Sequence, residues 1–120
     1  MTAENIERVI AELKGVYGDD VRVAKDANRV LVRVASVDLY ENCRPAATPM
    51  LFVLDPTQPK PLFYVQPGQL LTTGRPPKNS SSVLVGGETW MQFSFNIPWT
   101  ESQPIMRFVA AARQRFTQNE

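Results

Sequence analysis

The residues that could carry chemistry are few in this 120-residue sequence, which contains no histidine and a single cysteine, Cys43. Without an imidazole there is no Ser-His-Asp triad, no Cys-His pair and no histidine-containing zinc site. Carboxylates, lysines, tyrosines and Cys43 remain, and each would need a strongly shifted pKa to act as acid, base or nucleophile. We therefore expect no catalytic residue, no metal site and no cofactor, and an enzyme is the third alternative, after two classes of binding protein.

Cys43 lies between Asn42 and Arg44 in an irregular stretch, residues 38–49. A neighbouring arginine can lower the pKa of a thiol and so activate it as a nucleophile. Because no histidine is present to act as the base, we instead expect an inert thiol in a connecting loop. A lone cysteine forms no internal disulfide and is compatible with a reducing compartment.

A long stretch rich in proline, glycine and serine, residues 66–82, is the best loop candidate for a binding site. Loops of this length are uncommon in compact domains and often carry function. Its polar composition predicts poor packing, and we select Arg75, Lys78 and Asn79 as candidate partner-binding residues. The segment resembles a phosphate-binding loop in composition alone, because the Gly-Lys-Ser spacing is missing, so we expect no nucleotide site.

Helical periodicity predicts a helix near each end of the chain. The first helix has Thr2 as its cap, and we expect the charged residues off its apolar stripe to lie on a solvated face. Thr100 and Gln103 have capping-box spacing and predict that the last helix begins there, with Glu101 in its first turn and Pro104 early in the helix. The apolar stripe of the first helix comprises Ile6, Val9, Ile10 and Leu13, and its expected solvated charges are Glu7, Arg8 and Glu12. The apolar stripe of the last helix comprises Ile105, Phe108, Val109, Ala112 and Phe116.

Four strands are predicted between the two helices, at residues 21–23, 29–37, 50–54 and 62–65, with turn chemistry at 26–28. Val30, Val32 and Val34 alternate and should share one buried face. Arg29 and Arg33 should then stand in solvent, and we assign them no role in nucleic-acid binding. The expected fold class is α+β: an N-terminal helix, a four-stranded antiparallel meander, a long loop and a C-terminal helix.

An aromatic stretch, residues 86–116, contains both tryptophans. We expect the rest of the chain to pack against it. We expect Trp99 to be buried between the last helix and the sheet. Strict alternation would put Met91, Phe93 and Phe95 on one face, which leaves Trp90 as the bulky residue of the other. Trp90 either covers an edge of the core or is partly exposed beside the loop as an anchor for a protein partner.

The length and net charge of the chain limit the possible domain organisation, partners and location of the protein. A chain of 120 residues is of the size of one domain, spanning 1–120, and 13 basic against 12 acidic residues give a net charge of +1. No overall field attracts nucleic acid or anionic lipid, and no apolar run has the length of a membrane span. The first fifteen residues are charged and periodic, unlike a signal peptide, so we expect a cytoplasmic protein.

The element order and several residues resemble the ubiquitin-conjugating enzyme superfamily, especially its divergent prokaryotic branch. The stretch 50–56, Met-Leu-Phe-Val-Leu-Asp-Pro, followed by 59–65, Pro-Lys-Pro-Leu-Phe-Tyr-Val, is similar to that family's third strand, proline-rich passage and fourth strand. Trp99-Thr100-Glu101-Ser102 is similar to the tryptophan segment that opens the helix after the active site. The resemblance covers nearly the whole chain.

The departures from that family concern its catalytic residues. The family's spacing would place the thioester cysteine near Trp90 or Met91, and the His-Pro-Asn motif is absent, with Pro77-Lys78-Asn79 as its nearest counterpart. The resemblance therefore implies an inactive variant, a non-catalytic binding or scaffold protein of a bacterial ubiquitin-like modification system. Its implied partner is a ubiquitin-like protein or an activating or conjugating component. The alternative is an unrelated small α+β chaperone or adaptor that binds a protein or peptide.

Overall fold

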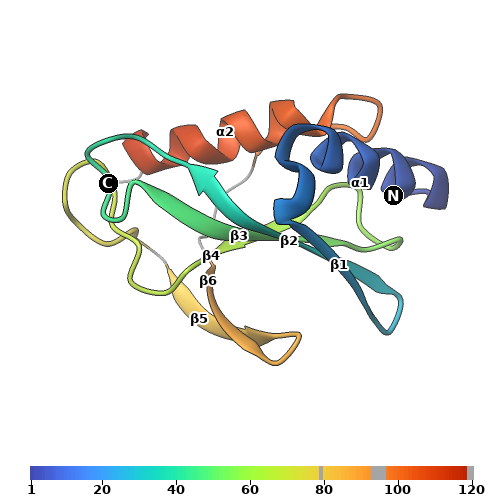
Figure 1. The fold of residues 1–120 in the computed structure, drawn as a ribbon, viewed down its shortest axis with the longest axis horizontal. Coiled ribbons are helices and arrows are strands. Elements are labelled where there is room, and N and C mark those ends of the chain that lie inside the picture. The colour runs from blue at the N-terminus through green and yellow to red at the C-terminus, as the bar shows by residue number, and fades with distance from the viewer. Residues whose placement is uncertain (79, 93–96, 119–120) are drawn as a thin grey trace.

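The computed structural model describes residues 1–78, 80–92 and 97–118, so the predictions made for Asn79, Phe93 and Phe95 lie outside it. Two helices and six strands follow one another along the chain (Figure 1). In order they are α1 (Ala3–Tyr17), β1 (Val21–Asp26), β2 (Arg29–Asp38), β3 (Ala47–Leu54), β4 (Leu62–Val65), β5 (Ser81–Val85), β6 (Glu88–Gln92) and α2 (Ile105–Gln118), with a short 3₁₀ turn at Gly18–Asp20.

The strands form one antiparallel sheet in the order β1-β2-β3-β4-β6-β5. The first four are the predicted meander, and the α+β class is confirmed. The prediction of only four strands is wrong, because β5 and β6 form a further hairpin that begins at Ser81, inside the stretch assigned to the long loop. Its two-residue turn, Gly86-Gly87, has positive φ at both positions (59° and 81°), the geometry that closes a tight hairpin.

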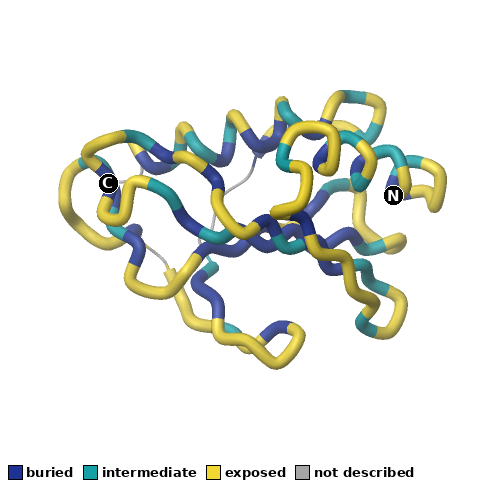
Figure 2. Tube along the Cα trace, viewed as in Figure 1, coloured by how far each residue is buried: buried dark blue, intermediate teal, exposed yellow. Residues whose placement is uncertain are grey.

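Both helices lie on one face of the sheet, and the main core fills the space between (Figures 1 and 2). The predicted apolar stripes of the two helices are buried, apart from Ile10, which is half-buried. Val32 and Val34 of β2 are buried on the same side, and Val30 packs against them. The rings of Phe52, Phe63 and Trp99 surround Phe108 edge-on, with centroid distances of 6.0 to 6.4 Å. The predicted burial of Trp99 is therefore confirmed.

The opposite face of the sheet has a smaller core of its own. The β5–β6 hairpin lies beneath this face in Figure 1, and among the described residues one pair, Val65 with Met91, joins it to β4. The hairpin turn lies close against β2, because a Cβ added to Gly86 would come within 2.9 Å of Leu31 Cδ1. The buried residues of this second core are Leu31, Leu51, Val53, Tyr64, Val85 and Trp90.

Neither helix in the described part of the chain is long and apolar enough to cross a membrane.

The turn between β1 and β2 contains one strained residue, Ala27, whose φ is 56°. In a left-handed backbone conformation the Cβ atom of an L-residue clashes with the backbone, whereas glycine has no Cβ atom and no such clash. We expect Ala27→Gly to raise the free energy of unfolding by about 0.5 kcal/mol, because relief of about 1 kcal/mol of strain exceeds the added entropy of the unfolded chain. Urea denaturation of the variant measures this gain. Ala24→Gly in the middle of β1 is the control, which should destabilise, and an equal loss in both variants would contradict the strain.

Candidate functional site

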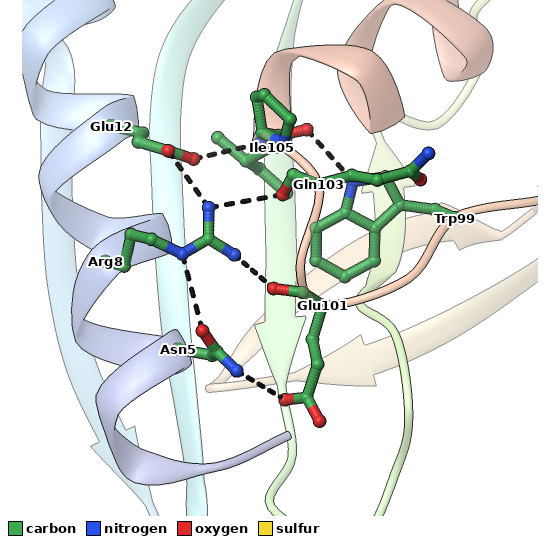
Figure 3. A network of polar contacts seen from close by, with 8 residues as sticks. Asn5, Arg8, Glu12, Trp99, Glu101, Gln103 and Ile105 are labelled. Carbon is green, nitrogen blue, oxygen red and sulfur yellow. Dashed lines mark hydrogen bonds and ion pairs between the residues drawn. The ribbon is translucent and has the colours of Figure 1, made fainter.

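The first polar cluster joins α1 to the start of α2 (Figure 3). Glu12 Oε1 accepts a hydrogen bond from the Ile105 N–H at 2.9 Å and so caps α2 from another helix. Arg8 donates to the other oxygen of Glu12 at 3.0 Å and to the backbone carbonyls of Gln103, at 3.2 Å, and Glu101. Arg8 and Glu12 thus hold the turn that leads into α2.

The same cluster extends to the beginning of α1. Glu101 Oε2 accepts from the Thr2 backbone N–H at 2.9 Å and from Asn5 Nδ2 at 3.1 Å. These donors lower the pKa of Glu101 below its ordinary value, the Thr2 N–H contributing most. The polar groups of this cluster bind one another, so we interpret it as a structural clamp rather than a ligand site.

Two predictions about this region need correction. Arg8 and Glu12 do not form a solvated face, since their side chains are only 32% and 31% exposed and bind the turn. Gln103 Oε1 does accept from the Thr100 N–H, at 3.1 Å, but the helix begins at Ile105, after Pro104. The capping-box residues therefore close the preceding turn, and the cap of α2 comes from Glu12.

We expect Glu12→Ala to lower the free energy of unfolding by about 1 to 2 kcal/mol, because the helix loses its cap and Arg8 loses its carboxylate partner. Chemical denaturation monitored by circular dichroism measures the change. Glu7→Ala is the matched control, since Glu7 is exposed on the same helix and its removal should stay within about 0.5 kcal/mol. Equal effects of the two variants would show that the clamp contributes nothing.

Cys43 lies in the main core with 0% exposure, and its backbone N–H donates to the Tyr40 carbonyl at 2.9 Å. A nucleophile must be reachable by its substrate, and this thiol is enclosed by packed side chains. The expected position in a connecting loop is confirmed, but the residue is a core residue as well.

We expect the Cys43 thiol to react with a maleimide much more slowly in the folded protein than in the urea-unfolded chain, because reaction requires opening of the core. Mass spectrometry of the alkylated protein against time measures both rates. Cys43→Ser should leave partner binding intact. Comparable rates in the two states would place the thiol at the surface.

The second polar cluster lies on the hairpin face of the sheet. Arg33 of β2 pairs with Glu88 of β6 through two contacts, 3.1 and 3.2 Å, and its guanidinium carbon lies 5.4 Å from the ring centroid of Trp90. Arg33 therefore does not simply stand in solvent, as predicted, but fastens the hairpin to the sheet. Arg29 is likewise paired, with Asp26 at 2.6 Å.

Two surface hollows flank this ion pair, with volumes of about 290 and 150 Å³. Arg33, Glu88 and Trp90 line both. The larger hollow also has Pro49, Gln66, Pro67 and Thr89 in its wall, and the smaller has Val23, Leu31, Leu51 and Val85. The described lining residues of the two hollows include no cysteine, serine or lysine.

Trp90 is 2% exposed and belongs to the second core. The interpretation that it covers an edge of the core agrees with this burial, whereas the partly exposed position of the anchor interpretation is wrong. The role of Trp90 in partner binding stays a prediction. Because the side chain is buried, a partner could reach it only if the hairpin opened.

The long loop is better packed than predicted. Gln69 and Leu71 are buried, and the Thr72 N–H and hydroxyl both donate to the Phe116 carbonyl near the end of α2, at 3.1 and 3.3 Å. Arg75 and Lys78 are exposed on the part of the loop that leads into β5. The structure thus places the two basic residues on the segment before the hairpin, whereas Trp90 lies in the second core.

Sequence reasoning missed Arg33, Glu88 and Leu84 as residues of this face. A local signal was available for the hairpin, since Gly86-Gly87 separates two runs of β-forming residues, 83–85 and 89–91. No such signal existed for the pairing of Arg33 with Glu88, which are 55 positions apart.

Within the described ranges, no three potential metal-ligating side chains gather in one place. No protein-family model matches the chain, and no characterised protein or solved structure is significantly similar to it.

Proposed function

We propose that this chain is a non-catalytic protein-binding or scaffold module, similar to an inactive ubiquitin-conjugating enzyme, that acts in a bacterial ubiquitin-like modification system. The sequence resemblance is the reason for proposing this modification system. The partner would be a ubiquitin-like protein or an activating or conjugating component. The enclosure of Cys43 is the observation that supports a non-catalytic role. A thioester would need an exposed thiol, and neither Trp90 nor Met91 can provide one.

The exposed groups of the hairpin side support protein binding. Leu84 of β5 is 73% exposed, the largest exposed fraction among the exposed large apolar residues of the described chain. Arg75 and Lys78 lie just before that strand and are exposed as well. Leu84 and the two basic residues lie on consecutive segments of the chain, β5 and the loop before it. In a recognition surface an exposed apolar group contributes affinity and charges contribute selectivity.

The second candidate is a small α+β adaptor or chaperone unrelated to conjugating enzymes. The β5–β6 hairpin favours it, because this hairpin extends the sheet beyond the four-stranded meander that the resemblance implies. In this alternative the chain also binds a protein or peptide, but no ubiquitin-like component is involved.

A reconstitution distinguishes the two. The protein is mixed with ATP and with the activating-enzyme-like and ubiquitin-like proteins encoded by adjacent genes, and the mixture is analysed by size-exclusion chromatography and non-reducing gels. We expect co-elution with one of them and no reducible adduct. An adduct on Cys43 would overturn the non-catalytic role, and the absence of such genes or of any co-elution would favour the adaptor.

A further inference from the structure

The six-stranded sheet has two edges, and they differ in how well they are protected. The edge strand β1, Val21–Asp26, carries Arg22, Lys25 and Asp26. The other edge strand, β5, has the sequence Ser-Ser-Val-Leu-Val, without a charge, a proline or a bulge. Charged residues, prolines and bulges are the usual devices that prevent an edge from pairing with another chain. β5 has none of these devices and is therefore open to pairing.

The hairpin geometry shows which backbone groups of β5 are available. The turn at Gly86-Gly87 makes the flanking residues, Val85 and Glu88, a hydrogen-bonded pair, and the pattern then alternates along the ladder. Val83 and Ser81 accordingly bond to β6, whereas the N–H and C=O groups of Ser82 and Leu84 point outward. In the described part of the chain β6 is the sole strand beside β5, so these outward groups have no strand partner there.

We propose that β5 binds an extended peptide segment of a partner protein, which adds to the sheet as a seventh, antiparallel strand. The outward groups of Ser82 and Leu84 would provide the main-chain hydrogen bonds, and the exposed Leu84 side chain would contact an apolar residue of the peptide. This inference rests on the proposed protein-binding function and names the site and the kind of partner.

The loop that precedes β5 indicates the charge of the peptide. Lys78 is three residues before Ser81, so its backbone is within about 10 Å of the start of the strand. In an antiparallel arrangement the carboxyl end of the peptide lies at this end of β5. We therefore expect acidic residues, or the terminal carboxylate, after the apolar part of the peptide, near Arg75 and Lys78.

A second copy of the chain fits this edge less well. Two-fold pairing of β5 with itself would place the Lys78 end of each strand beside the hairpin turn of the other copy, where Glu88 is already paired with Arg33. The basic loop would gain no free carboxylate.

Proline substitutions test the main-chain contacts selectively. Ser82→Pro removes one outward N–H and keeps the bonds to β6, a position at which edge strands tolerate proline. Lys25→Pro is the matched control, because the two-residue turn after Asp26 makes Asp26 and Arg29 a bonded pair, which leaves the Lys25 N–H pointing outward on the opposite edge. Leu84→Lys is a second variant that places a charge on β5 without altering its backbone.

The probe is a phage-displayed library of random octapeptides selected on the full chain, followed by synthesis of the enriched peptides and titration by fluorescence anisotropy. We expect alternating β-forming residues with acidic residues at the carboxyl end. Ser82→Pro and Leu84→Lys should each weaken binding by about tenfold or more, and Lys25→Pro should leave it unchanged. Amide hydrogen exchange should slow at Ser82 and Leu84 when peptide is bound, and thermal melts should show that the variants fold.

The contrary outcomes are distinct. Peptides that bind Ser82→Pro and Leu84→Lys as well as the wild type would overturn the β5 site while the proposed binding function stands. Failure to enrich any peptide would also overturn it, whatever the reconstitution shows. A concentration-dependent dimer that Ser82→Pro abolishes would assign the edge to a second copy of the chain. If the peptide binds as expected but no ubiquitin-like component co-elutes, the adaptor alternative holds instead.

Discussion

Trp99→Ala is expected to lower the free energy of unfolding by about 3 to 5 kcal/mol, the range for truncation of a buried aromatic residue. Trp99 is 7% exposed, and its ring packs edge-on against Phe108 of α2 at 6.0 Å. Its Nε1–H also donates to the Pro104 carbonyl at 3.0 Å, immediately before the helix. The variant therefore loses apolar burial and leaves a carbonyl without its donor. Urea denaturation with circular dichroism detection measures the loss.

Trp99→Phe separates the two contributions. Phenylalanine keeps most of the apolar contact with Phe108 but cannot donate to Pro104, so its loss should be clearly smaller than that of the alanine variant. An unfolding free energy that is unchanged in Trp99→Ala would show that the ring does not hold α2 on the sheet.

Trp90→Ala is expected to cost about 3 to 5 kcal/mol as well, but through the other face of the sheet. The ring is the bulkiest member of the second core, which also includes Leu31, Tyr64 and Val85, and it lies beneath the Arg33 guanidinium. Without it the described part of the β5–β6 hairpin keeps the residue pair to β4, the ion pair of Arg33 with Glu88 and Val85 as its buried residue in the second core. Amide hydrogen exchange of β5 and β6 should therefore accelerate more than that of β2 and β3.

Glu88→Gln is the matched control for this face. The Arg33–Glu88 pair is partly solvated, with side chains 37% and 50% exposed, so its loss should change stability by at most about 1 kcal/mol. Preserved stability of Trp90→Ala together with loss of a specific partner would instead make Trp90 a binding residue. Loss of stability with partner binding retained would assign it to the core.

The parts of the fold that could be predicted are those with a local pattern. The stripes at Ile6, Val9 and Leu13 and at Ile105, Phe108 and Ala112 repeat with the helical period, and both helices bury them. Alternation and turn residues likewise identified the first four strands, because both depend on neighbours in sequence. The burial of Trp99 followed from its residue type, and the position of Cys43 in a connecting loop followed from the irregular stretch around it.

The candidate site was predicted less well, and the errors share one cause. Arg8, Glu12 and Arg33 look like ordinary surface charges when each is considered with its sequence neighbours. Their partners lie 55 to 95 positions away, on the turn before α2 and on β6. No periodicity can reveal a contact of that separation in a single sequence.

The sequence by itself determined the α+β class, the two amphipathic helices, the four-stranded meander and the absence of histidine-dependent sites. Only the tertiary structure decided that β5 and β6 extend the sheet, that Trp90 closes a second core, and that β5 is an unprotected edge. The physical reason is that secondary structure depends on local periodicity, whereas a sheet edge exists only once all strands have taken their places. Whether Ser82 and Leu84 direct their backbone groups inward or outward is likewise determined by the register of the hairpin.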